Sequence, residues 1–101
     1  MVSDKPFVDY TISMNTRVRC FDEDVEHDKL VWHRDGEYRE IQVVSGDRWQ
    51  LQIDNELPQT LEIGQSYRIP KEVYHRLIRG LGNLVVIIDE QDPRKAWYDA
   101  R

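Results

Sequence analysis

The sequence contains a single cysteine, Cys20, in a chain of 101 residues. One cysteine cannot form a disulfide within the chain, and a reducing compartment is the simpler expectation. No apolar run approaches the roughly 20 residues that a transmembrane helix needs. Residues 1–6 also lack the apolar core of a secretory signal peptide. We therefore expect a soluble, cytoplasmic protein that has no membrane partner.

Glycine and proline are also few, at five and four residues, and no segment repeats or has low complexity. Disorder is therefore not expected away from the termini. The net charge of −5 argues against nucleic acid as the main partner, because surfaces that bind nucleic acid are typically basic. With 40% hydrophobic residues, residues 1–101 predict a single domain with a buried core.

Helical periodicity is missing over nearly the whole chain, and short segments rich in β-branched and aromatic residues take its place. These segments have the lengths of β-strands and are separated by turn residues. They are residues 7–12, 16–21, 29–34, 38–44, 49–53, 57–63, 67–70, 73–79 and 84–89. Asp92 followed by Pro93 is a helix-start signal and predicts a short helix over residues 94–100. About nine short strands and one C-terminal helix predict an all-β barrel or sandwich.

Two of the three histidines lie in strand-like segments that a barrel would bring together. The first segment contains His33, Asp35, Arg39 and Gly46, at intervals of two, four and seven residues. The second contains Gly64, Pro70, Glu72, His75 and Arg79, at intervals of six, two, three and four residues. Side chains two residues apart on a strand point to the same face. We therefore expect one interior cavity to hold the two histidines, the aspartate and both arginines.

This spacing resembles that of the cupin family, whose small jelly-roll barrel brings two such motifs together in its interior. The resemblance covers residues 30–90 and implies an RmlC-like cupin domain. Cupins usually hold a metal with three histidines and one glutamate. Here His33 and His75 match two of the histidines, Asp35 replaces the third, and Arg39 stands where the glutamate is expected. A guanidinium cannot coordinate a cation, so the implied metal ligands are His33, Asp35 and His75.

The first interpretation of this cavity is a metal site. Two histidines and one carboxylate leave coordination positions open and suit Fe(II), with Zn, Mn or Ni as alternatives. The imidazoles must be neutral and the carboxylate ionised, so the metal would be lost at low pH. Arg39 or Arg79 would then hold a substrate carboxylate. The protein would be a small dioxygenase, another metal-assisted enzyme, or a metal-binding protein without catalysis.

The second interpretation is a metal-free site in which Arg39 pairs with Asp35. Arginine and histidine would bind a small ligand such as a carboxylate, a phosphate or a sugar, with or without isomerase-type catalysis by a His–carboxylate pair. Together with Gln52 and Tyr74, Arg39 and Arg79 are the candidate ligand-binding residues.

The third interpretation is a structural or interaction protein whose buried polar network only stabilises the barrel. The resemblance to small cupins also implies a homodimer. Tyr67, Tyr74 and Trp97 are candidates for its interface, although core packing explains them equally well. The sequence leaves the three interpretations open.

Overall fold

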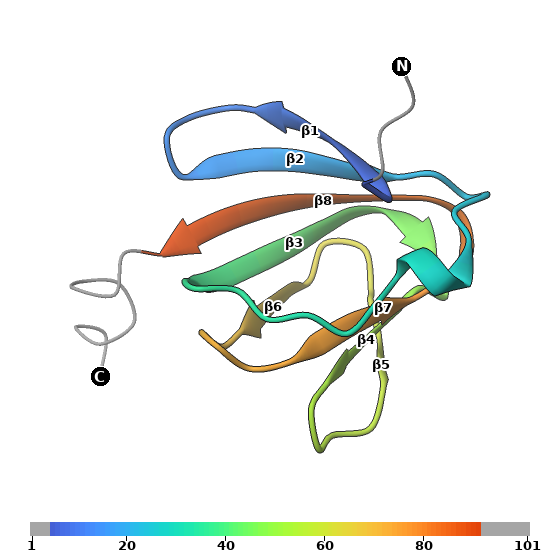
Figure 1. Ribbon diagram of the computed structural model, residues 1–101. Coiled ribbons are helices and arrows are strands. Elements are labelled where there is room, and N and C mark those ends of the chain that lie inside the picture. The colour runs from blue at the N-terminus through green and yellow to red at the C-terminus, as the bar shows by residue number, and fades with distance from the viewer. Residues whose placement is uncertain (1–4, 92–101) are drawn as a thin grey trace.

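The computed structural model describes residues 5–91, which form eight β-strands and one short 3-10 helix (Figure 1). The strands are β1 (Phe7–Thr11), β2 (Thr16–Phe21), β3 (Tyr38–Asp47), β4 (Gln50–Ile53), β5 (Gln59–Thr60), β6 (Ser66–Ile69), β7 (His75–Ile78) and β8 (Leu81–Gln91). The 3-10 helix, His27–Lys29, lies between β2 and β3. Within the described residues, no helix is long and apolar enough to cross a membrane.

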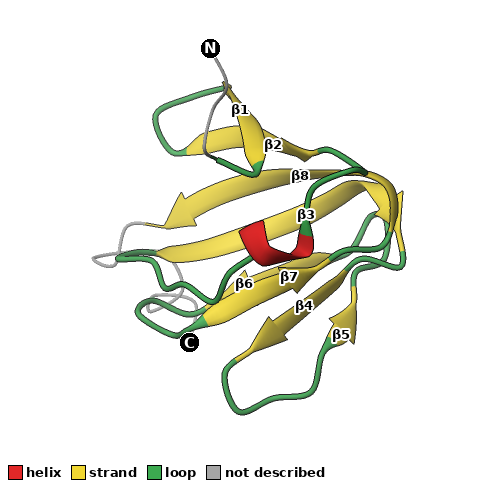
Figure 2. Ribbon diagram, turned by 45° about the vertical axis from the view of Figure 1, so that its right-hand side comes forward, coloured by secondary structure: helices red, strands yellow, loops and turns green. Residues whose placement is uncertain are grey.

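The strands form two antiparallel sheets that enclose one core (Figure 2). The larger sheet has the strand order β1-β2-β8-β3-β6, and the smaller has the order β5-β4-β7. Ile41, Val43 and Leu84 from the larger sheet and Leu51 and Ile53 from the smaller sheet belong to one buried apolar cluster. The prediction of a small all-β barrel is therefore confirmed.

Strand β4 shows how the sequence pattern produces this arrangement. Leu51 and Ile53 are buried, whereas Gln50 and Gln52 are half-buried on the opposite face. Successive side chains of a strand alternate between faces, so one apolar face turns inward as a unit. Trp49, which precedes β4, is completely buried, and its indole N–H donates to the Gly82 carbonyl at 3.1 Å.

Gly46 lies where β3 shifts its register against β8. Its φ of +128° is strained for a residue with a side chain, and a Cβ there would come within 3.0 Å of Leu84 Cδ1. The same Cβ would approach Trp49 Cδ1 to 3.3 Å. A glycine therefore allows β3 to bend closely over the core, with Arg39 and Ile41 in the regular part of the strand before the bend.

Residues 29–34, predicted as a strand, do not form one. The segment contains the end of the 3-10 helix and a single isolated bridge, between His33 and His75. Leu30 is buried, but Val31 is 57% exposed and Trp32 is 40% exposed. The segment buries Leu30 at one end and does not bury a whole strand face. Its β-branched and aromatic residues therefore led to the wrong prediction of a strand.

The other differences concern element boundaries. Residues 80–83, predicted as a turn, already include the start of β8, where Leu81 pairs with Asp47. The predicted strand over residues 57–63 is reduced to Gln59–Thr60. The predicted helix over residues 94–100 lies outside the described residues.

Candidate functional site

Three potential metal ligands come together beside β7. His33, Asp35 and His75 each offer one ligand atom, and these atoms all lie within 4.8 Å of one another. His75 begins β7, and His33 reaches it through two backbone hydrogen bonds, from His33 N–H at 3.0 Å and from His75 N–H at 2.8 Å. The ring centroids of the two imidazoles are 4.3 Å apart. The Asp35 carbonyl accepts a hydrogen bond from Glu72 N–H at 2.8 Å. Backbone contacts thus hold two distant segments at the cluster.

Backbone carbonyls also determine which ring nitrogen of each imidazole carries the hydrogen. Nδ1 of His33 lies 2.9 Å from the Val31 oxygen, and Nδ1 of His75 lies 2.9 Å from the Val73 oxygen. A carbonyl oxygen only accepts, so each Nδ1 must carry a hydrogen and donate it. When the rings are neutral, their lone pairs are therefore on Nε2. A second contact of this kind orients the histidines in most protein metal sites.

The Asp35 carboxylate has an oxygen that the described residues leave without a hydrogen-bond donor. This atom, Oδ2, is buried and lies 3.2 Å from His75 Nε2 and 3.4 Å from Arg39 Nη1. Burial acts to raise the pKa of Asp35, but a hydrogen bond that His75 donates when its Nε2 carries a proton, together with the charge of Arg39, outweighs burial and lowers this pKa. A neutral His75 would direct a lone pair at this oxygen. A proton on Nε2, or a cation bound to both atoms, removes that conflict.

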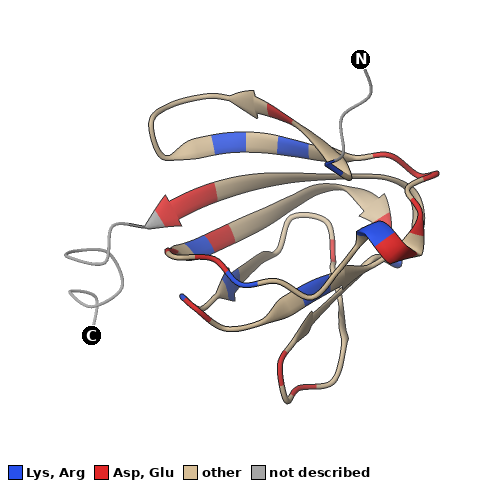
Figure 3. Ribbon diagram, viewed as in Figure 1, with Lys and Arg blue, Asp and Glu red and all other residues tan. Residues whose placement is uncertain are grey.

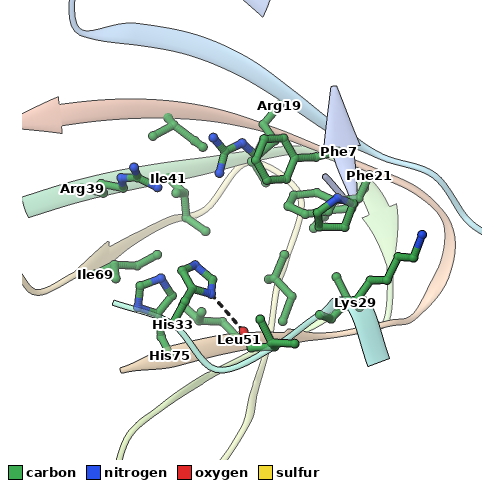
Figure 4. A pocket seen from close by; sticks show the side chains of 17 residues that line it. Phe7, Arg19, Phe21, Lys29, His33, Arg39, Ile41, Leu51, Ile69 and His75 are labelled. Atoms are coloured by element: carbon green, nitrogen blue, oxygen red, sulfur yellow. Dashed lines mark hydrogen bonds between the residues drawn. The ribbon is translucent and has the colours of Figure 1, made fainter. Parts of the chain in front are cut away.

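The two imidazoles face a cavity of about 230 Å³ between the sheets (Figure 4). In that view they lie at one end beside Ile69, while Phe7 and Phe21 lie at the other end. The apolar lining includes Phe7, Phe21, Ile41, Leu51, Ile69, Leu77 and Ile88. The polar side chains of the lining are His33, His75, Arg19, Arg39 and Lys29. The wall is therefore apolar over most of its area, and its polar groups are basic or imidazole.

Solved structures with the same architecture are numerous. DMSP lyase DddQ from Ruegeria pomeroyi has a TM-score of 0.70 and 13% identity, over 90% of this chain and 50% of that chain. An RmlC-like cupin family protein with a double-stranded β-helix fold from Methanocaldococcus jannaschii has a TM-score of 0.62 and 13% identity, over 89% of this chain and 84% of that chain. The chain has the cupin fold.

The cupin fold is shared with larger proteins, of which this chain spans about half or less. It covers 50% of DddQ and 41% of the chain in a structure titled FeII HppE, at a TM-score of 0.59 and 17% identity over 75% of this chain. Comparisons with protein-family models and with curated proteins found no match. At these identities the likeness establishes the architecture, which confirms the fold that the sequence motifs predicted.

Arg39, where cupins usually carry a glutamate, is surrounded by carboxylates. Its Nε and Nη2 donate to Glu37 Oε1 at 3.1 and 2.8 Å, and Nη2 also donates to Glu90 Oε2 at 3.1 Å. Glu90 accepts two more hydrogen bonds, from Arg17 at 2.9 and 3.0 Å, and these lower the pKa of Glu90 to about 2. With Asp35 on its remaining side, Arg39 has its charge compensated by its neighbours. Figure 3 shows this grouping of acidic and basic residues along β2, β3 and β8.

Two residues predicted to share the cavity, Asp35 and Arg79, are not among the residues that line it. Strand β7 ends at Ile78, so the alternation that places His75 and Leu77 at the cavity does not continue to Arg79. Its Nη1 instead donates to the Val25 carbonyl at 2.8 Å. Arg79 therefore anchors the loop between β2 and the 3-10 helix.

Gln52 and Tyr74, the other predicted ligand-binding residues, also lie outside the lining. Gln52 is on the polar face of β4, where it accepts from Arg76 Nε at 3.0 Å and donates to the Glu56 carbonyl at 3.1 Å. Tyr74 is 45% exposed, and the Arg34 guanidinium lies 5.3 Å from its ring centre. The alternation of β4 places Gln52 on the outside, and Tyr74 lies in the loop that precedes β7.

The sequence analysis missed the residues of β1 and β2 that line the cavity, because neither strand carries a recognisable motif. Phe7 and Phe21 are paired across these strands, with ring centroids 5.5 Å apart. Arg19 lies on the same face and donates to the Asp9 carboxylate at 2.7 and 2.9 Å. The sequence could have revealed them through strand alternation, because in a hairpin of β1 and β2 the side chains of Phe7, Arg19 and Phe21 lie on one face.

Proposed function

We propose that this cupin-fold chain binds one divalent transition-metal ion through Nε2 of His33, Nε2 of His75 and the carboxylate of Asp35. The observation that carries the proposal is the buried Asp35 Oδ2, which accepts no hydrogen bond within the described residues and lies 3.2 Å from His75 Nε2. A cation accepts electron pairs from both atoms and so relieves their repulsion. Two imidazoles and one carboxylate are the donor set of non-haem Fe(II) sites, and Zn, Mn or Ni are alternatives.

The charge of Arg39 is the main objection to a cation at this position. A single positive charge 4 Å away opposes each unit of cation charge by about 4 kcal/mol at an effective dielectric constant of 20. Besides the proposed ligand Asp35, the carboxylates of Glu37 and Glu90 contact the same guanidinium at 2.8 and 3.1 Å, and their negative charge offsets part of its repulsion. The donor set therefore fits a divalent ion in spite of the arginine.

A metal in such a site polarises an oxygen of a bound ligand and lowers the pKa of a bound water. The chain's own residues prepare the site for this chemistry. The Val31 and Val73 carbonyls hold the two imidazoles with Nε2 free, Arg39 restrains the Asp35 carboxylate, and the cavity wall beside the imidazoles is mostly apolar.

Metal analysis after purification without a chelator tests the proposal. We expect one equivalent of metal in the wild type and at least a tenfold weaker affinity in His33→Ala, His75→Gln and Asp35→Asn, since the loss of one ligand weakens a three-ligand site strongly. His27→Ala is the matched control, because His27 lies in the 3-10 helix and does not belong to the cluster. Wild-type metal affinity in both His33→Ala and His75→Gln would exclude the site.

A metal-free site is the second candidate, and the same 3.2 Å distance favours it. If His75 is protonated, Nε2 and Asp35 Oδ2 form an ion pair, and the imidazolium offers a positive charge at the inner end of the cavity. Ligand binding that persists, undiminished, after exhaustive chelation would select this candidate over the metal site.

The predicted homodimer and the cytoplasmic location stay predictions. Of the predicted interface residues, Trp97 lies outside the described residues and Tyr67 packs against the core. For the dimer we propose the outer face of β1. Val8 and Tyr10 of this edge strand and Ile12, which directly follows it, are 56%, 60% and 60% exposed. An antiparallel edge strand can pair with its own copy about a two-fold axis, which makes the contact self-complementary.

A further inference from the structure

The apolar wall of the cavity restricts what kind of molecule can occupy it. Of the 17 residues that line it within the described chain, none has a hydroxyl, amide or carboxylate side chain. A sugar or a phosphate would bring several polar groups into contact with this wall. Each group that lost its hydrogen bonds to water without replacement would cost about 1–3 kcal/mol. The body of the ligand is therefore apolar.

Basic side chains lie at both ends of the cavity. The guanidinium of Arg19 is 3.6 Å from the Phe7 ring centre, and Lys29 lines the same end. His33, His75 and Arg39 lie at the end of the proposed metal ligands. A metal ion bound there adds positive charge, and no acidic side chain lines the cavity in the described chain to attract a cationic ligand. An anionic head group that can reach open coordination positions fits this end. A carboxylate is the simplest such group.

The volume sets the size of the ligand. A cavity of about 150 Å³ lined by leucine, isoleucine and phenylalanine holds one benzene molecule. By that measure, the cavity of about 230 Å³ in this chain accommodates roughly nine non-hydrogen atoms.

We propose that the cavity binds a medium-chain or aryl monocarboxylic acid, with the carboxylate at the His33–Asp35–His75 cluster and the apolar body between Phe7, Phe21, Leu51 and Leu77. This inference rests on the proposed metal site, because the carboxylate takes up the positions that the three protein ligands leave open. It goes beyond that function in naming the ligand class.

A chain-length series tests the inference on the Co(II)-loaded and the metal-free full-length protein. Calorimetry with acetate, butanoate, hexanoate, octanoate and decanoate is expected to show an affinity gain of about fourfold for each added methylene group. The gain should stop between hexanoate and octanoate, where the ligand exceeds about nine non-hydrogen atoms and with them the cavity. Octan-1-ol and octylamine, which have the same chain but not the carboxylate, are expected to bind at least tenfold more weakly than octanoate.

A pair of neighbouring substitutions locates the binding. Leu77 lines the cavity, whereas Ile78, the next residue of β7, does not. Leu77→Trp fills part of the space and is expected to weaken octanoate binding at least tenfold while Co(II) binding is retained. Ile78→Trp has the same bulk on the other face and is expected to leave octanoate binding unchanged. The length series on the wild type decides the question if Leu77→Trp does not fold.

The outcomes separate the ligand from the metal. Co(II) binding together with equal affinities for acetate and octanoate would overturn the inference and leave the metal site intact. Absence of Co(II) binding, together with a rising length series in the metal-free protein, would overturn the metal site and support the ligand class. Octylamine or octan-1-ol binding as tightly as octanoate would overturn the choice of an acid.

Discussion

Replacing Arg39 by glutamine should destabilise the metal-free protein and strengthen its affinity for metal. The guanidinium is 12% exposed and contacts the carboxylates of Asp35, Glu37 and Glu90 at 3.4, 2.8 and 3.1 Å. Removing one partner of a buried ion pair costs about 3–5 kcal/mol. Because the side chains of Glu37 and Glu90 are 35% and 23% exposed, solvent screening reduces the expected loss to about 2 kcal/mol.

The same substitution should strengthen the affinity for metal, although it destabilises the metal-free protein. Removing one positive charge about 4 Å from a divalent ion relieves several kcal/mol at an effective dielectric constant of 20. The Asp35 carboxylate loses a restraint at the same time, so we expect a net gain of about ten- to a hundredfold in metal affinity. The metal-loaded variant should consequently recover most of the stability that the metal-free variant lost.

Urea denaturation with and without Co(II) measures the change in the free energy of unfolding, and direct metal titration measures the change in metal affinity. Arg68→Gln is the matched control, because Arg68 is 61% exposed and its ion pair with Glu40 is long, at 3.9 Å. The control should change the free energy of unfolding by less than about 0.5 kcal/mol. Unchanged or weaker metal affinity in Arg39→Gln would refute the view that the arginine opposes a cation at the cluster.

Three further predictions follow from the structure. Hydrogen bonds from Arg17 lower the pKa of Glu90 from 4.5 to about 2. As the pH falls, Glu90 is therefore protonated in the unfolded chain before it is protonated in the folded chain. The corresponding stabilisation, of about 1 kcal/mol after screening, should be complete above pH 4.5 and disappear towards pH 2. Urea melts of Glu90→Gln should lack this pH dependence, and an equal dependence in the variant would contradict the assignment. Gly46→Ala should cost about 1–3 kcal/mol in urea melts because of the positive φ and the close Leu84 contact. Gly36→Ala should be nearly neutral, because within the described residues a Cβ there would come no nearer than 4.0 Å to Glu72 Oε2. Tyr10→Lys should convert a dimer to a monomer in light scattering, and a wild type that is already monomeric at high concentration would exclude the β1 interface.

The motif spacing predicted the fold and the three potential metal ligands for a physical reason. Barrel pairing brings residues of β7 next to the segment before β3, and His33 meets His75 there through two backbone hydrogen bonds. Asp35, which lies outside any strand, is held nearby by the hydrogen bond from Glu72 N–H to its carbonyl. These relations depend on the backbone alone, so they can be read from residue intervals.

Side-chain partners could not be read in the same way. Arg39 was expected to face Asp35, and it does so at 3.4 Å, but its stronger contacts are with Glu37 and Glu90. Glu90 lies 51 residues away in the sequence, and its pairing with Arg39 depends on the register of β3 against β8. Arg79 was misplaced because its strand ends one residue earlier than the pattern indicates.

The His33–His75 bridge makes the coordination geometry inseparable from two amide protons. Both amides donate across the bridge, at 3.0 and 2.8 Å, so any local opening that releases the segment around His33 also pulls the imidazoles apart. An ion coordinated by both imidazoles would oppose that opening, because the two segments could not separate without breaking a metal–ligand bond. Deuterium uptake at these two backbone amides should therefore become slower when a metal ion binds to the side chains of the cluster.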